Sequence, residues 1–86
     1  MEEHNNARIY IVDDDSLSAE VMVSLLKGSG HTVESTSDAA SAFDQILDSR
    51  PDCIICEMMM PEVDGLNLCK RIRETPDLAG IRFIMV

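Results

Sequence analysis

The stretch Ile9-Tyr10-Ile11-Val12-Asp13-Asp14-Asp15 decides the fold, because an apolar run typical of a β-strand ends abruptly in three acids. A second apolar run, Cys53-Ile54-Ile55-Cys56, is also followed at once by an acid, Glu57. Short continuous apolar runs are typical of strands that are covered on both faces, as in a parallel sheet. The carboxyl ends of parallel strands meet at the edge of the sheet where ligands bind, so we expect these acids to form one pocket.

Carboxylates gathered in this way predict a cation site. Neighbouring carboxylates repel one another, and each negative charge raises the free energy of ionising the others unless a cation lies between them. A site made only of hard oxygen ligands suits Mg²⁺. The sequence therefore predicts a magnesium site at the ends of the two strands.

Strand and helix patterns alternate along the rest of the chain. Strands are predicted at residues 7–12, 32–35, 53–56 and 83–86. The first helix is predicted to begin at an N-cap formed by Ser16 and the second at one formed by Ser37 or Asp38, while the turn pair Asp64-Gly65 precedes the third. The order βαβαβαβ predicts right-handed crossovers and an α/β fold in which helices cover a parallel sheet.

Apolar residues at helical spacing predict the side of each helix that faces the core. They are Leu17, Val21, Met22, Leu25 and Leu26 in the first helix, Ala39, Phe43, Ile46 and Leu47 in the second, and Leu66, Cys69 and Ile72 in the third. Cys53 and Cys56 stand three positions apart in a predicted strand, which places their side chains on opposite faces about 10 Å apart, beyond disulfide reach. We expect both to be plain thiols.

Composition limits the partners of the chain. Eighty-six residues are enough for one domain, residues 1–86, and a net charge of −9 disfavours nucleic-acid phosphates and anionic membrane surfaces as partners. No apolar run approaches the roughly 20 residues of a membrane span. The polar, acidic start at residues 1–6 lacks the pattern of a secretory signal, so a cytoplasmic location is expected.

A longer motif surrounds the second acidic strand end. It reads Pro51-Asp52-Cys53-Ile54-Ile55-Cys56-Glu57-Met58-Met59-Met60-Pro61-Glu62-Val63-Asp64-Gly65-Leu66. Together with residues 9–15, this motif resembles the CheY-like receiver domain of two-component response regulators, and the resemblance extends from about Arg8 to Val86. It implies a flavodoxin-like, three-layer α/β sandwich with sheet order 2-1-3-4, with the first helix on one face and the second and third on the other. The chain would then end before the family's fifth strand and last two helices.

The resemblance also implies a role for each acid. Asp14 would bind Mg²⁺ directly, Asp13 would do so through a water molecule, and the backbone carbonyl of Met59 would complete the protein ligands. Glu57 stands at the position of the phosphoaccepting aspartate and is also expected to contact the metal. The implied partners are a sensor histidine kinase or a histidine phosphotransfer protein, and a downstream effector domain or protein.

Glu57 departs from the family pattern, in which this position is an aspartate. One extra methylene moves the carboxylate by about 1 Å, and misplacement on that scale can cost on the order of 10²-fold in a reaction that depends on positioning. We therefore expect poor phosphoryl transfer. Three interpretations stay open: a phosphomimetic Glu57, a pseudo-receiver that acts as an interaction module without phosphoryl transfer, and a glutamate that only preserves the charge of the pocket.

An enzyme is the less favoured alternative. Asp13 and Asp15 also match the Asp-x-Asp pattern of haloacid-dehalogenase-type phosphatases, in which they would act as nucleophile and acid. Leu17 departs from that family, which has Thr or Val at this position. We therefore expect a signalling module and no enzymatic activity.

The last predicted strand also affects assembly. An 86-residue chain leaves residues 83–86 as an open apolar edge beside a bare face near the first helix. Four such side chains left in water forfeit roughly 1.5–3 kcal/mol each, and unpaired apolar edges recruit other strands. We therefore expect this chain to dimerise or to exchange elements between copies.

Overall fold

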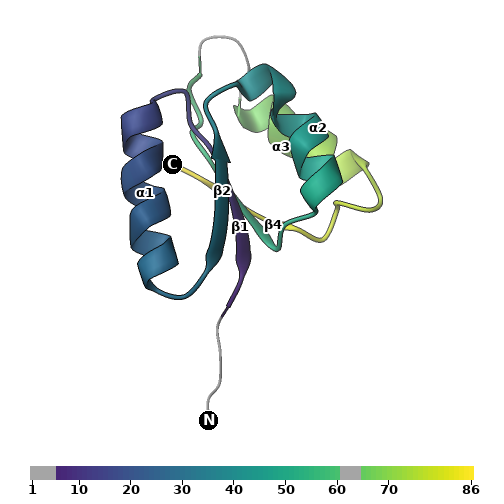
Figure 1. Cartoon of the computed structure of the whole chain (residues 1–86). Helices are drawn as coiled ribbons and strands as arrows, with labels where there is room; N and C mark the ends of the chain where they lie inside the picture. The colour runs from purple at the N-terminus through teal and green to yellow at the C-terminus, as the bar shows by residue number, and fades with distance from the viewer. Residues whose placement is uncertain (1–5, 61–64) are drawn as a thin grey trace.

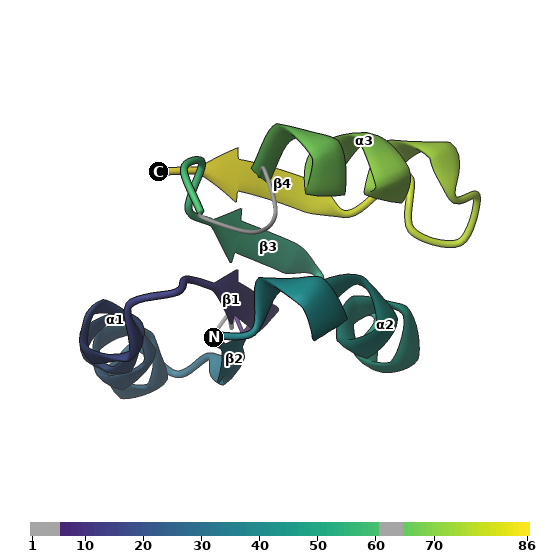
Figure 2. The same cartoon turned by 90° about the horizontal axis from the view of Figure 1, so that it is seen from above.

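The computed structural model describes residues 6–60 and 65–86, which form a four-stranded parallel sheet with helices on both faces (Figure 1). The elements in chain order are β1 (Arg8–Val12), α1 (Ser16–Gly28), β2 (Thr32–Thr36), α2 (Ala39–Ser49), β3 (Cys53–Cys56), α3 (Gly65–Glu74) and β4 (Arg82–Met85). The strand order is β2-β1-β3-β4, with α1 on one face of the sheet and α2 and α3 on the other (Figure 2). The three-layer α/β sandwich and the sheet order 2-1-3-4 are confirmed.

The registers of the strands bring the carboxyl ends of β1 and β3 to the same edge. Val12 at the end of β1 lies opposite both Thr36 of β2 and Cys56 of β3. Hydrogen bonds between backbones continue past the strands, and Asp13 N donates to Thr36 O at 3.1 Å. Glu57 N donates to Val12 O at 2.9 Å. The acids that follow β1 and β3 are therefore held in neighbouring positions.

Two apolar cores lie on opposite faces of the sheet. The larger core lies under α2 and α3 and contains the fully buried Ile46 and Ile54, while the smaller lies under α1 and contains Ile11. Burying an aliphatic side chain of this size contributes roughly 1.5–3 kcal/mol. Cys56 belongs to the larger core and Cys53 packs against the smaller one, and both are free thiols. Their predicted placement on opposite faces is confirmed.

Aspartates cap the first two helices. The Asp15 side chain accepts hydrogen bonds from Leu17 N at 3.1 Å and Ser18 N at 3.4 Å, so the prediction of Ser16 as the N-cap is wrong. The hydrogen bond from the Ser18 hydroxyl, followed by these backbone bonds, lowers the pKa of Asp15. Ser16 is instead the first helical residue, because the preceding acid accepts the free N–H groups of the first turn. Asp38 caps α2, as predicted, by accepting from Ala40 N at 3.1 Å.

The apolar side of α1 is wider than the surface that it covers. Met22 and Leu26 pack against the smaller core, whereas Leu17, Val21 and Leu25 are 70%, 55% and 67% exposed. The prediction that all five residues face the core is therefore wrong for three of them. The physical reason is that the three exposed residues, spaced four apart, form a stripe along the flank of a helix that rests mainly on β2.

The core-facing sides of α2 and α3 are also offset from the prediction. Leu47 and Leu66 are exposed, while Ala42 and Leu68 are buried. Successive residues of a helix point about 100° apart, so a neighbour of a buried position can already face water. The remaining predicted positions, Ala39, Phe43, Ile46, Cys69 and Ile72, are buried or half-buried.

The strand ends differ from the prediction by one residue. β1 begins at Arg8, β2 extends to Thr36, and β4 spans Arg82–Met85, although Val86 N still donates to Cys56 O at 3.0 Å. The turn pair at residues 64–65 lies partly outside the described residues, as does Pro61. Within the described segments, no helix combines the length and the apolar composition needed to cross a membrane.

Candidate metal site

Three carboxylates converge where β1 and β3 end. Asp13 and Asp14 follow β1, Glu57 follows β3, and one carboxylate oxygen of each lies within 4.8 Å of those of the other two. Among the described residues, these three form the acidic group that is compact enough to hold a metal ion. The structure thus brings together the three side chains that the sequence places at one edge of the sheet.

The three acids differ in their exposure to water. Asp13 is buried at 7% exposure, Glu57 is half-buried, and Asp14 is exposed. Asp13 Oδ1 accepts a hydrogen bond from Asp15 N at 2.9 Å, which fixes its carboxylate. Glu57 Oε1 is buried and has no hydrogen-bond partner among the described residues. A buried acceptor without a partner is costly, so this oxygen favours a cation or a donor in the pocket.

The electrostatics of the cluster also favour a bound cation. A proton on Glu57 can be shared with the neighbouring Asp13 carboxylate and then with that of Asp14, and these interactions, followed by burial and the charges of both aspartates, raise the pKa of Glu57 to about 7. The cluster therefore retains a proton near neutral pH when no cation is bound, since three close carboxylates resist full ionisation. Three carboxylates with an unpartnered buried oxygen have the donor chemistry that Mg²⁺ requires, so the residues present fit the metal.

Gly65 is a supporting residue that sequence reasoning treated only as part of a turn pair. A Cβ atom at this position would lie 2.7 Å from Glu57 O, closer than real Cβ atoms approach, and 3.1 Å from Met58 Cα, which is also tight. Gly65 N also donates to Met58 O at 3.1 Å, and Met58 N donates to Val86 O at 3.1 Å. Helix α3 can therefore begin directly against the backbone that carries Glu57 only because this residue lacks a side chain.

Met59 lies in the described part of the loop after β3, and its side chain is exposed. The role of its backbone carbonyl as a metal ligand stays a prediction.

The fold and the site together define the class of this protein. A parallel sheet of order 2-1-3-4 with acids at the carboxyl ends of β1 and β3 is the flavodoxin-like arrangement of a receiver domain. The family model of the response regulator receiver domain matches residues 9–86. The chain belongs to this family.

Curated relatives agree with this assignment. The chain is similar to Response regulator MprA of Mycobacterium sp. strain KMS, with 40% identity over 70 residues, covering 81% of this chain and 30% of the relative. It is 39% identical over 72 residues to Response regulator MprA of Mycobacterium bovis strain BCG / Pasteur 1173P2, covering 84% of this chain and 31% of that one. The chain therefore spans about three tenths of the length of these relatives.

Solved structures show the same fold. A putative response regulator from Chloroflexus aurantiacus is 34% identical, with a TM-score of 0.87, over 94% of this chain and 66% of that one. The signal receiver domain of a signal transduction histidine kinase from Syntrophus aciditrophicus is 34% identical, with a TM-score of 0.86, over 93% and 61%. The chemotaxis response regulator CheY4 of Vibrio cholerae is 29% identical, with a TM-score of 0.83, over 94% and 68%.

Proposed function

We propose that this receiver domain binds Mg²⁺ at its acidic pocket and accepts phosphoryl groups poorly, so that it signals in a phosphorylation-deficient form. The observation that supports the metal site is the convergence of Asp13, Asp14 and Glu57 within 4.8 Å. Asp14 and Glu57 would contact the ion directly, Asp13 through water, and Met59 through its carbonyl. Bound Mg²⁺ would neutralise the carboxylates and the charge of an incoming phosphoryl group.

Two properties of Glu57 support poor phosphoryl transfer. Its carboxylate stands one methylene further from the backbone than that of an aspartate, which displaces the attacking oxygen from the position that the family uses. Its pKa of about 7 also leaves much of the metal-free cluster protonated at neutral pH, and a protonated carboxyl is a weak nucleophile. The negative charge that Glu57 carries into the pocket on ionisation makes it a candidate mimic of the phosphorylated state.

Chemical phosphorylation tests this proposal. The protein is incubated with acetyl phosphate and Mg²⁺, and the intact mass is measured with and without Glu57→Asp. We expect little labelling of the Glu57 protein and more labelling of the Glu57→Asp variant, because the shorter side chain restores the matching acceptor length. Robust labelling of the unmodified protein at Glu57 would contradict the positional argument.

The partners of the proposed module follow from its family. They are a sensor histidine kinase or a histidine phosphotransfer protein upstream, and an effector domain or protein downstream. A phosphorylation-deficient receiver can still bind both, so we expect complex formation to depend less on Glu57 than phosphoryl transfer does. Binding measured with Glu57 and Glu57→Asp proteins separates the two properties.

We also propose that the 86-residue chain associates with a second copy through the edge of β4 and the flank of α1. Support comes from exposed apolar side chains on these two elements, Leu25 of α1 and Ile84 of β4. In Figure 2, α1 covers the β2 half of its face of the sheet and leaves the β4 half open. We expect a dimer by light scattering and a melting temperature that rises with protein concentration. A monomer with a concentration-independent melt would contradict this proposal.

A further inference from the structure

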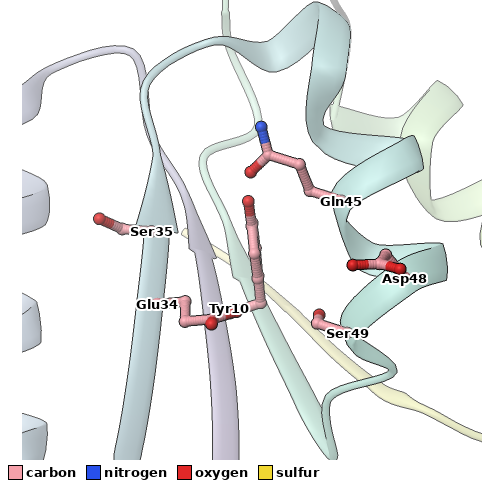
Figure 3. Close-up of a pocket in the computed structure, with 6 residues that line it drawn as sticks. All are labelled: Tyr10, Glu34, Ser35, Gln45, Asp48 and Ser49. Atoms are coloured by element: carbon pink, nitrogen blue, oxygen red, sulfur yellow. The ribbon is translucent and has the colours of Figure 1, made fainter.

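A second polar pocket, of about 470 Å³, lies between β1, β2 and α2 (Figure 3). Its lining residues are Tyr10, Glu34, Ser35, Gln45, Asp48 and Ser49, none of which belongs to the metal cluster. Its volume falls within the usual range of small-molecule sites, roughly 300–1,000 Å³. The pocket therefore has room for a ligand of its own.

Two buried hydroxyl groups at this pocket have no hydrogen-bond partner in residues 6–60 and 65–86. Tyr10 is only 2% exposed, and neither its hydroxyl oxygen nor Ser49 Oγ finds a partner within hydrogen-bonding geometry among the described residues. Burial, followed by the charge of Glu34, raises the pKa of Tyr10, so the phenol is neutral at physiological pH. The Thr36 side chain opposes this shift as a nearby hydrogen-bonding group, but it lies outside the geometry of a formed hydrogen bond to the Tyr10 hydroxyl. Buried hydroxyls normally have partners, so these two unsatisfied groups favour a polar ligand that enters the pocket beside them.

Oxygen acceptors also line this pocket. Glu34 comes from β2 on one side and Asp48 from α2 on the other (Figure 3). Gln45 Nε2 donates to Ser41 Oγ at 2.9 Å, and the amide oxygen is turned toward the hydroxyl end of Tyr10. No lining residue within the described chain carries a positive charge. The pocket thus offers acceptors and two negative charges to a donor-rich cation.

We propose that this pocket binds a guanidinium group, carried either by a free small molecule or by an arginine side chain of a partner protein. A compact metal ion fits poorly, because Glu34 and Asp48 do not converge with a third acid as the metal cluster does. A guanidinium presents five N–H donors in one plane and is weakly hydrated, which suits carboxylates on opposite walls with hydroxyl and amide oxygens between them.

Binding can be observed directly at Tyr10. It is the chain's single tyrosine and there is no tryptophan, so intrinsic fluorescence reports on the pocket itself. The probes are agmatine, the capped peptide Gly-Arg-Gly, and the same peptide with neutral citrulline in place of arginine, each at saturating Mg²⁺. We expect saturable binding of the guanidinium probes and at least about tenfold weaker binding of the citrulline peptide, because charge-assisted hydrogen bonds are lost. If agmatine binds at least as tightly as the arginine peptide, the natural ligand is a free small molecule. Tighter binding of the peptide indicates an arginine side chain of a partner protein.

Matched variants locate the site. Asp48→Asn should weaken binding of the arginine peptide by about tenfold, because one wall loses its charge. Asp44→Asn, on the same helix but outside the pocket, should leave binding of the arginine peptide unchanged. This variant controls for non-specific attraction to the net charge of −9. Tyr10→Phe should also weaken binding, which is measured by NMR because this variant lacks the fluorescent tyrosine. Absence of binding by either guanidinium probe, equal binding of the citrulline peptide, or equal loss in both aspartate variants would overturn the proposal.

Discussion

The chain carries two acidic pockets that differ in how their carboxylates are arranged. At the ends of β1 and β3, the carboxylates of Asp13, Asp14 and Glu57 come within 4.8 Å of one another. Beside β2, Glu34 and Asp48 stand on separate elements and line a pocket together with hydroxyl and amide groups. The first arrangement concentrates charge at one point, and the second spreads it around a larger space.

This difference shows that acidity alone does not define a ligand. Converging carboxylates share a proton and suit a small ion that takes several oxygens at once. Separated carboxylates with neutral acceptors suit a flat organic cation that donates hydrogen bonds in several directions. The two pockets should therefore respond to different cations and to different substitutions.

The largest expected effect is on magnesium binding. Asp14→Asn removes a proposed direct ligand and should lower Mg²⁺ affinity by more than about 10²-fold, since loss of outer-shell groups alone can cost 10–100-fold. The same variant should bind the arginine peptide normally. Asp48→Asn should show the reverse pattern, with Mg²⁺ affinity unchanged. Calorimetric titration of both ligands into both variants tests this, and parallel losses in one variant would contradict the separation of the two sites.

A substitution behind the metal pocket should have the next largest effect. In Gly65→Ala, the new Cβ meets Glu57 O at 2.7 Å, so the loop must shift, at a cost of about 1–3 kcal/mol in unfolding free energy. Mg²⁺ affinity should fall as well, whereas the pocket beside β2 should be unaffected. Gly80→Ala is the control, because a Cβ there meets nothing within 4 Å. Equal effects of the two substitutions would show that Gly65 has no special role.

Magnesium binding should also depend on pH. With a Glu57 pKa of about 7, protons compete with the metal, so Mg²⁺ affinity should fall about tenfold between about pH 8 and about pH 6.

The raised pKa of Glu57 also affects the stability of the metal-free fold. Its contribution to stability is fully present below the unfolded-state value near 4.5 and is lost as the pH rises through about 7. Chemical denaturation across this range, with Glu57→Gln as the control that abolishes the effect, provides the measurement.

The smallest expected effect concerns the hydroxyl of Tyr10. Because this hydroxyl forms no hydrogen bond within the described part of the chain, Tyr10→Phe should change the unfolding free energy by no more than about 0.5 kcal/mol in the absence of a ligand. The same substitution should weaken arginine-peptide binding. Destabilisation above about 1 kcal/mol would instead indicate that the hydroxyl supports the fold.

The sheet and the convergence of the three acids could be predicted from the sequence because local patterns encode both. Apolar runs that end in Asp13 and Glu57 identify two strands. They also predict where these acids lie, because the carboxyl ends of parallel strands meet at the same edge of the sheet. The N-cap of α1 was misplaced because Ser16 and Asp15 are both good caps, and only the backbone conformation decides between them.

Other features depend on packing that no local pattern records. The exposure of Leu17 and Val21 follows from where α1 rests on the sheet, and the sequence shows only that they are apolar. The pocket beside β2 brings Tyr10, Glu34 and Asp48 together from three elements, and each of these residues looks ordinary in its own segment. Gly65 likewise shows its importance only through the backbone of Glu57 against which it packs.

Calorimetric titration of Mg²⁺ into the metal-free protein near pH 7, in two buffers of different ionisation enthalpy, tests the central claim most directly. The two buffers report both the number of ions bound and the number of protons released. We expect one ion per chain and release of roughly half a proton, because the Glu57 pKa is about 7 and the metal displaces that proton. Absence of saturable binding at millimolar Mg²⁺, or binding without proton release that persists in Asp14→Asn, would contradict the assignment of this cluster as the metal site.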